Sequence, residues 1–163
     1  MAAFEAAQCG ADNVYLIECD HVGGTCLNYG CVPTKTILRS AHAAHEINHA
    51  QEVGIEGGGA PQLNLEALRN RKVDVVEKLR AQIMAGVKKH KVEFIAGRGV
   101  MTGAHQITVE LSSPDAAGET TGVIDADIII IATGSVPFKL PMINHDLENV
   151  WTSDEALALD KIP

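Results

Sequence analysis

The strongest constraint on the fold is the run DIIIIATGS at residues 127–135. Its four consecutive isoleucines do not alternate with polar residues, so both faces of this segment need apolar neighbours. A β-branched run of this kind is typical of a central strand in a parallel sheet, where helices cover both faces. The run therefore predicts an α/β fold.

The segments around this run alternate between helical and strand patterns. Helices are expected at 1–9, 33–50, 64–90 and 152–159, and strands at 13–18, 92–97, 106–111 and 121–125. Gly10 is placed to end the first helix, and Pro33 suits the first turn of the second. Thr152 or Ser153 suits the N-cap of the last helix. This order predicts a doubly wound parallel sheet of the Rossmann-like type with a small antiparallel β insertion.

Composition narrows the class of protein. A chain of 163 residues with 46% apolar residues is large enough for one globular domain with its own core. The net charge of −8 argues against a nucleic-acid partner or an anionic membrane surface. No apolar run approaches transmembrane length, and residues 1–15 lack the layout of a signal peptide. The four cysteines are therefore expected in the cytoplasm, where thiols stay reduced unless a protein uses them.

Two of these cysteines, Cys26 and Cys31, lie in the stretch GGTCLNYGCVPTK at residues 23–35. Zinc sites usually combine a Cys-x2-Cys pair with two further ligands, whereas this Cys-x4-Cys spacing has no second pair, so no metal site is expected. Two neighbouring thiols without a joint role are another alternative. A redox pair that opens and closes during turnover is the third.

The local backbone decides how the two thiols can meet. In an ideal helix, residues five apart are rotated by roughly 140°, so the chain between Cys26 and Cys31 has to bend. Gly30 can adopt the conformation that such a bend requires. Cys31 lies beside the N-terminus of the next predicted helix, whose dipole stabilises a thiolate. This arrangement favours a pair suited to dithiol–disulfide exchange.

The same stretch resembles the redox-active disulfide motif of the class I pyridine nucleotide–disulfide oxidoreductases. These flavoenzymes include dihydrolipoamide dehydrogenase, glutathione reductase and mercuric reductase. VYLIE at 14–18 is similar to the family's second strand, whose terminal acid binds the adenosine ribose of FAD. ATGSVP at 132–137 is similar to a later strand and turn of the FAD domain, and SDEALALDKIP at 153–163 to the segment before the NAD(P) domain.

The resemblance implies a role for each matching residue. Cys26 would be the interchange thiol that reacts with the substrate, and Cys31 would lie against the flavin as the charge-transfer thiolate. Lys35 would balance charge near the flavin N5, and Glu18 would bind ribose hydroxyls of FAD. The remaining implied cofactor-binding residues are Gly23, Gly24, Thr25, Gly97, Gly99, Ala132, Thr133, Gly134 and Ser135.

These last residues fall in three segments. Residues 23–25 would let the backbone approach the pyrophosphate and the ribityl chain. Residues 97 and 99 match a glycine-containing turn near the adenine, and residues 132–135 would line the cofactor. Cys9 and Cys19 match no redox position of the family and are expected to be ordinary thiols.

The resemblance has gaps at both ends of the chain. A dinucleotide-binding fold normally begins with a strand, a G-x-G-x-x-G loop and a helix, and this sequence begins inside that helix. GRGVMTG at 97–103 is not a substitute, because it has one residue too many and precedes a strand. Pro163 falls where the family's NAD(P) domain would start. Residues 1–163 are therefore expected to be a partial FAD-binding domain, without the NAD(P) and dimerisation domains.

By this resemblance, the expected function is that of a flavin-dependent disulfide oxidoreductase. Electrons would pass between NAD(P)H, FAD and the Cys26–Cys31 disulfide to a small-molecule or protein-bound dithiol or disulfide, with dihydrolipoamide/lipoamide favoured. The full-length enzyme would be a homodimer, and this chain alone would be inactive. A mercuric reductase-like enzyme is one alternative, and a redox or metal-binding thiol module without flavin is another. Retention of Glu18, Lys35 and ATGS beside the cysteines favours the flavoenzyme.

Overall fold

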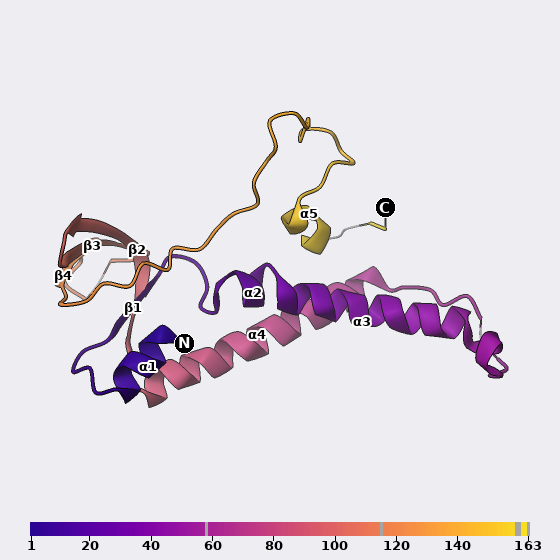
Figure 1. The fold of residues 1–163 in the computed structure, drawn as a ribbon, viewed down its shortest axis with the longest axis horizontal. Coiled ribbons are helices and arrows are strands. Elements are labelled where there is room, and N and C mark those ends of the chain that lie inside the picture. Colours follow the sequence, from indigo (N-terminus) through magenta and orange to yellow (C-terminus); the bar gives the residue numbers. More distant parts are fainter. Residues whose placement is uncertain (58, 115, 159–160, 163) are drawn as a thin grey trace. The chain divides into compact units, whose positions relative to one another are not determined.

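The computed structural model describes residues 1–57, 59–114, 116–158, 161 and 162. The chain divides into two compact units, coloured by sequence in Figure 1. The first unit comprises Met1–Val22 and Arg80–Thr133, and the second comprises Gly23–Leu79 and Gly134–Pro163. Pro163 and residue 159 of the last predicted helix lie outside the described residues.

The first unit contains a four-stranded mixed sheet. Its elements are α1 (Ala2–Gln8), β1 (Tyr15–Glu18), the end of α4 (Leu65–Lys89), β2 (Glu93–Gly103), β3 (Gln106–Leu111) and β4 (Thr121–Asp125). The strand order is β1-β2-β3-β4, with β1 parallel to β2 and the other pairs antiparallel. Figure 1 shows β2 lying between β1 and β3. The strands predicted at 13–18, 92–97, 106–111 and 121–125 and the predicted antiparallel insertion are therefore confirmed.

β2 is longer than the sequence pattern indicates because it changes partner along its length. Its first part pairs with β1, from Tyr15 opposite Glu93 to Glu18 opposite Ala96. Its second part pairs with β3, starting with Gly97 opposite Leu111. One strand thus joins the parallel part of the sheet to the antiparallel part.

The core of this unit lies where the end of α4 meets the sheet and α1. Val87 and Val109 are the most deeply buried large side chains, with 2% and 1% of their surfaces exposed. The Phe4 ring of α1 stacks on His90, with ring centroids 5.1 Å apart. A Cβ at Gly86 would lie 2.9 Å from the Phe4 ring, so a glycine at this point of α4 lets α1 pack closely.

The turn expected at residues 97 and 99 is wrong, because both glycines lie inside β2. Gly97 is buried opposite Leu111, and a Cβ there would lie 2.5 Å from the backbone oxygen of Glu110. Gly99 lies opposite Val109. A Cβ added at Gly99 would lie 3.4 Å from the Ile107 side chain, which is an ordinary contact distance. The β3 backbone therefore leaves no room for a side chain at position 97, which explains the glycine there.

The strand expected at residues 127–135 is also wrong. No residue of this run is in a strand, and no described strand pairs with it. Ile128, Ile130 and Ile131 are exposed over 82%, 64% and 68% of their surfaces. The physical reason is that a strand's N–H and C=O groups need a neighbouring strand, and β-branched composition does not supply one.

The second unit is helical. It contains α2 (Gly24–Asn28), α3 (Cys31–Asn48), the 3-10 helix η1 (Ala50–Val53), the first part of α4 and α5 (Ser153–Ala158). α3 begins at Cys31, two residues before the predicted start, and Pro33 lies in its first turn as predicted. The predicted long helix at 64–90 is confirmed by α4. No helix in the described part of the chain is long and apolar enough to cross a membrane.

The start of α5 confirms the predicted cap. The Thr152 hydroxyl oxygen accepts a hydrogen bond from the Asp154 N–H at 3.2 Å, and the Glu155 carboxylate accepts one from the Thr152 N–H at 2.7 Å. This reciprocal arrangement is a capping box. The Thr152 hydroxyl also donates to Glu155, and these bonds lower the pKa of the Glu155 carboxyl.

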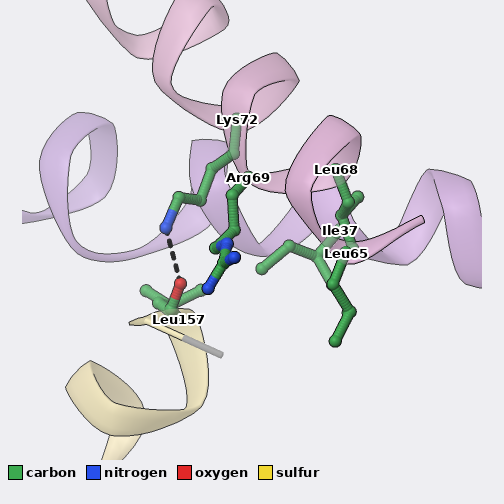
Figure 2. Close-up of a pocket in the computed structure, with 6 residues that line it drawn as sticks. All are labelled: Ile37, Leu65, Leu68, Arg69, Lys72 and Leu157. Atoms are coloured by element: carbon green, nitrogen blue, oxygen red, sulfur yellow. Dashed lines mark hydrogen bonds between the residues drawn. The ribbon is translucent and has the colours of Figure 1, made fainter. Parts of the chain in front are cut away.

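The other end of α5 is held on α4 by Lys72. Its Nζ donates a hydrogen bond to the Leu157 carbonyl oxygen at 2.6 Å, as Figure 2 shows. A positive group on the last carbonyls of a helix satisfies acceptors that have no partner inside the helix. Burial, with a smaller contribution from Arg69, lowers the pKa of Lys72. A small pocket beside this contact is lined by Ile37, Leu65, Leu68, Arg69, Lys72 and Leu157.

Candidate functional site

The candidate site is the segment that joins α2 to α3 in the second unit. Cys26 lies within α2, and Cys31 is the first residue of α3. Between the helices the backbone leaves helical geometry at Tyr29, with φ −133° and ψ 14°, and at Gly30, with φ −138° and ψ −113°. The predicted bend between the two cysteines is therefore confirmed.

Gly30 is in close contact with the turn that carries Cys26. A Cβ added at Gly30 would lie 3.0 Å from the carbonyl oxygen of Thr25 and 3.2 Å from the Cα of Cys26. Both neighbouring atoms belong to the backbone, so neither can move aside as a flexible side chain would. The absence of a side chain at Gly30 lets the α2 backbone approach the start of α3.

The Cys31 thiol influences the titration of Cys26. All four cysteines of the chain are free thiols in this structure, and Cys26 and Cys31 are both exposed. A side-chain hydrogen bond with Cys31 is the main reason that the pKa of Cys26 is raised, and loss of hydration adds to it. A neighbour that raises the pKa of an acid stabilises its protonated form, so Cys31 favours the Cys26 thiol over the thiolate.

Two groups oppose this shift in the pKa of Cys26. The backbone of Cys31 hydrogen bonds to Cys26 and lowers its pKa, and the positive charge of Lys35 acts in the same direction. Lys35 lies one helical turn beyond Cys31 on α3 and is exposed. The structure thus brings together three of the predicted site residues: both cysteines and Lys35.

The raised pKa leads to a prediction on pH dependence. The folded chain keeps the Cys26 proton at pH values where an ordinary thiol has lost it. The stability contributed by this hydrogen bond is therefore present below the ordinary thiol pKa and is lost as the pH rises through the raised value. Alkylation of Cys26 by iodoacetamide, followed by mass spectrometry of the peptide, is expected to reach half its maximal rate at a higher pH than in Cys31→Ala.

A Lys35 variant provides a second test of this titration, with a shift in the opposite direction. Replacing it with Met removes a charge that favours the Cys26 thiolate, so the midpoint of alkylation should move further up. A midpoint that stays unchanged in Cys31→Ala would show that Cys31 does not raise the pKa of Cys26. Both variants are best compared in a Cys9→Ser/Cys19→Ser background, which leaves only the pair to react.

The glycines that begin α2 leave its N-terminus open. Gly23 and Gly24 adopt left-handed conformations, with φ of 111° and 67°, which residues with a Cβ rarely adopt. No side chain caps the N-terminus of α2, and a Cβ at Gly24 would meet no atom within 4 Å. Unpaired N–H groups at an open helix start can donate to a phosphate oxygen. This donor set fits the role predicted for residues 23–25.

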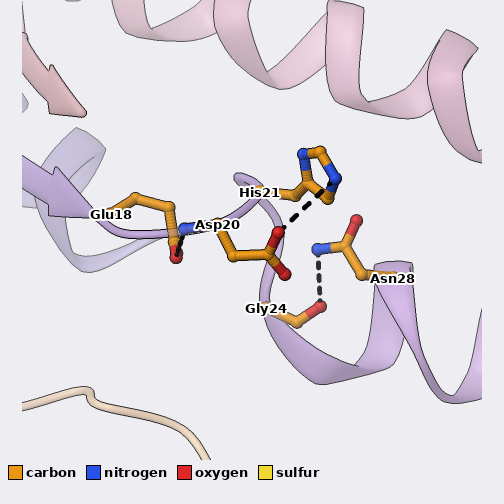
Figure 3. Close-up of polar contacts among 5 residues, drawn as sticks. All are labelled: Glu18, Asp20, His21, Gly24 and Asn28. Atoms are coloured by element: carbon orange, nitrogen blue, oxygen red, sulfur yellow. Dashed lines mark hydrogen bonds and ion pairs between the residues drawn. The ribbon is translucent and has the colours of Figure 1, made fainter. Parts of the chain in front are cut away.

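Glu18 lies in the first unit, at the end of β1. Its Oε1 accepts a hydrogen bond from the backbone N–H of Asp20 at 3.0 Å, and Asp20 Oδ1 lies 3.5 Å from His21 Nε2 (Figure 3). The register places Glu18 opposite Ala96, beside the glycines of β2, and the Ile17 side chain lies 3.5 Å from the position of a Cβ at Gly99. The structure therefore gathers Glu18, Gly97 and Gly99 at one part of this sheet.

Residues 132–135 are exposed and lie in neither a helix nor a strand. Gly134 has a φ of 79°, a left-handed conformation that favours glycine. Ala132 and Thr133 belong to the first unit, and Gly134 and Ser135 to the second. Their contact with a cofactor stays a prediction.

Three histidines recur at helical spacing: two lie on α3, at 42 and 45, and the third, at 49, is the residue that follows the helix. The rings of His45 and His49 lie 4.0 Å apart, and His49 Nδ1 is hydrogen bonded to the His45 carbonyl oxygen at 2.8 Å. Among the described residues, no group of three or more His, Cys, Asp or Glu side chains is arranged to hold a metal ion.

Sequence reasoning missed Asn28 and Thr34, which bond to Gly24 and Gly30, the glycines that precede Cys26 and Cys31. The Asn28 Nδ2 donates to the Gly24 carbonyl oxygen at 3.0 Å, and the Thr34 hydroxyl donates to the Gly30 carbonyl oxygen at 2.7 Å. The spacing in the sequence indicates both bonds. Each residue lies four positions after its glycine, and at this spacing a side chain on a helix can reach back to the earlier carbonyl oxygen.

Comparison with known proteins gives one consistent result. The family described as pyridine nucleotide-disulphide oxidoreductase matches residues 1–163. Dihydrolipoyl dehydrogenase of Zymomonas mobilis is 37% identical over 163 residues, which are 100% of this chain and 34% of the relative. A dihydrolipoyl dehydrogenase of Bacillus subtilis is 37% identical over 166 residues, covering 100% of this chain and 35% of the relative.

A solved structure agrees with these relatives. LpdA from Mycobacterium tuberculosis superposes with a TM-score of 0.76 and 28% identity, over 99% of this chain and 36% of that protein. The chain thus spans about a third of the length of the curated relatives that it matches. Its mixed α/β architecture agrees with a doubly wound, Rossmann-like fold. The sequence match over its whole length shows that the chain belongs to the pyridine nucleotide-disulphide oxidoreductase family.

Proposed function

We propose that this chain forms part of a flavin-dependent oxidoreductase in which Cys26 and Cys31 alternate between a dithiol and a disulfide. The observation that carries the proposal is the placement of Cys26 in α2 and Cys31 at the start of α3, with Gly30 against the backbone of Thr25 and Cys26. A disulfide forms only between cysteines whose backbones lie close together, and this contact brings them close. Lipoamide is the proposed substrate class, since the similar curated relatives are named dihydrolipoyl dehydrogenase.

The exchange step involves the cysteine pair of this chain and the two thiols of dihydrolipoamide. A thiolate of dihydrolipoamide attacks the Cys26 sulfur of the oxidised pair, the S–S bond breaks, and Cys31 leaves as a thiolate. The second substrate thiolate then attacks the substrate sulfur of the mixed disulfide, which closes the lipoamide ring and releases Cys26. Two electrons have passed from the substrate to the pair. Lys35, whose charge favours the Cys26 thiolate, assists this release.

FAD is the proposed carrier of these two electrons between the cysteine pair and NAD(P)H. The open start of α2 at residues 23–25 fits a pyrophosphate, and the carboxylate of Glu18 fits ribose hydroxyls. Lys35 and the remaining predicted contacts, Gly97, Gly99, Ala132, Thr133, Gly134 and Ser135, complete the proposed set. Residues 1–163 would accordingly form part of an FAD-binding domain.

The setting of the chain is part of the same proposal. The free, exposed thiols of all four cysteines suit the reducing cytoplasm, where we place the protein. A homodimer of the complete enzyme and a lipoyl group, free or attached to a protein, are the proposed partners. The net charge of −8 disfavours nucleic acid and anionic membrane surfaces.

The test is a direct exchange with substrate. The chain, in a Cys9→Ser/Cys19→Ser background, is oxidised, separated from oxidant and mixed with excess dihydrolipoamide. The expected result is two new alkylatable thiols per chain, located by mass spectrometry at positions 26 and 31. A chain that forms no disulfide between these positions, or whose disulfide does not react with dihydrolipoamide, would contradict the proposed function.

A further inference from the structure

We propose that Asn28 is a positioning residue for the cysteine pair: its side-chain amide closes the α2 turn and thereby sets how readily Cys26 and Cys31 form a disulfide. The proposal rests on the proposed function, because it needs the pair to exchange electrons. According to this proposal, a residue without a thiol, which lies between the two cysteines in the sequence, influences their redox equilibrium.

The first observation is the burial and bonding of Asn28. Only 9% of this residue is exposed, although it is polar and lies between two exposed cysteines. Its Nδ2 donates a hydrogen bond to the carbonyl oxygen of Gly24 at 3.0 Å, as Figure 3 shows. If this buried amide lost its acceptor, the folded state would be destabilised, because a buried donor without a partner costs free energy.

The second observation is the shortness of α2. The helix has five residues, far fewer than a helix needs to be stable by itself in water. The backbone bond from Tyr29 N–H to Thr25 oxygen, at 2.8 Å, closes its last turn. The Asn28 side chain adds a bond across residues 24–28, the span that contains Cys26.

The third observation links this turn to Cys31. The Gly30 backbone lies against the Thr25 carbonyl oxygen and the Cys26 Cα, so the position of the turn fixes the distance between the two cysteine backbones. If the turn opens, Cys26 samples more positions relative to Cys31. The effective concentration of one thiol at the other then falls, and the disulfide becomes less stable relative to the dithiol.

The redox equilibrium separates this role from a merely structural one. When oxidised dithiothreitol oxidises the pair, one S–S bond forms, two electrons and two protons leave the cysteines, and the S–S bond of the reagent breaks to give two thiols. Loss of a bond that stabilises both redox states equally lowers the free energy of unfolding but leaves this equilibrium constant unchanged. Loss of a positioning contact lowers the equilibrium constant itself.

Thr36 offers a matched control. Its hydroxyl donates to the Val32 carbonyl oxygen at 2.9 Å, a side-chain bond of the same i to i−4 type, and only 7% of the residue is exposed. It lies on α3, outside the segment between the cysteines. Thr36→Val removes a comparable bond without touching the α2 turn.

The experiment measures the equilibrium constant with dithiothreitol for the parent chain, Asn28→Leu and Thr36→Val, all in the Cys9→Ser/Cys19→Ser background. Each mixture is quenched with an alkylating agent, and the oxidised fraction is read by mass spectrometry. Asn28→Leu removes the Nδ2 bond to Gly24 and is expected to lower the constant for disulfide formation at least about fivefold, the size of one hydrogen bond. Thr36→Val is expected to leave it unchanged while lowering the melting temperature.

Equal constants in the parent chain and Asn28→Leu would overturn the proposal. If Asn28→Leu does not fold, Asn28→Gln, which moves the amide by one methylene group, replaces it, and an unchanged constant there has the same meaning. A parent chain that forms no Cys26–Cys31 disulfide at any ratio of oxidant would instead overturn the proposed function, and this result is recognised without any variant of Asn28.

Discussion

Cys31→Ser is expected to abolish the intramolecular disulfide and, with it, substrate exchange. Cys26 would then have no thiol neighbour across the Gly30 bend. A thiolate of dihydrolipoamide finds no S–S bond to attack, so the rate of exchange should fall by at least about a thousandfold, as for other variants that lose a reacting nucleophile. The oxidised fraction after treatment with oxidised dithiothreitol, read by alkylation and mass spectrometry, checks the result.

The variant also has a positive signature. With oxidised glutathione, Cys26 of Cys31→Ser should form a mixed disulfide that persists, because no second thiol resolves it. Cys19→Ser is the control, since Cys19 is exposed, lies in the other unit and is expected to leave the exchange unchanged. An intramolecular disulfide that still forms in Cys31→Ser would show that Cys26 has another partner. In a longer polypeptide that binds FAD, Cys31→Ser should keep the cofactor.

The sequence predicts the parts of this fold that depend on neighbours along the chain. α4 follows from apolar residues at helical spacing, and the bend before Cys31 follows from the geometry of two thiols five residues apart. The cap of α5 follows from a Thr three residues before a Glu. In each case the interacting groups lie within a few residues, so the local pattern contains the information.

The failures depend on segments that are far apart in the sequence. Residues 127–135 have the composition of a buried strand, yet a strand exists only where another strand completes its hydrogen bonds. Gly97 suggested a turn because glycines are common in turns, whereas its reason is the approach of the β3 backbone at Glu110. A pattern within one segment does not reveal which other segment packs against it.

The candidate site shows the same difference between contacts within one segment and contacts between distant segments. The cysteine pair and Lys35 come together because one short segment carries all three. The cofactor contacts are distributed over distant segments in both units, and they stay predictions. Asn28 was local and was still missed, because an Asn inside a motif looks like a solvated polar residue until its burial is known.

The second large effect is expected for Gly30→Ala. The added Cβ would lie 3.0 Å from the Thr25 carbonyl oxygen and 3.2 Å from the Cys26 Cα, closer than such atoms usually approach. Because both are backbone atoms, the α2 turn has to move as a whole and carry Cys26 away from Cys31. Overpacking of this kind typically costs about 1–3 kcal/mol, and a cost of about 1.4 kcal/mol borne by the disulfide form alone lowers its equilibrium constant tenfold.

Gly59→Ala is the matched control for this variant. Gly59 lies in the same unit, and a Cβ there would meet no atom within 4 Å. Chemical denaturation and the dithiothreitol equilibrium are measured for both variants in the Cys9→Ser/Cys19→Ser background. Gly30→Ala should lose stability and disulfide formation together, while Gly59→Ala changes neither. If the two variants behave alike, the contact between Gly30 and the α2 turn does not control the distance between the thiols, and the redox equilibrium is set elsewhere in the segment.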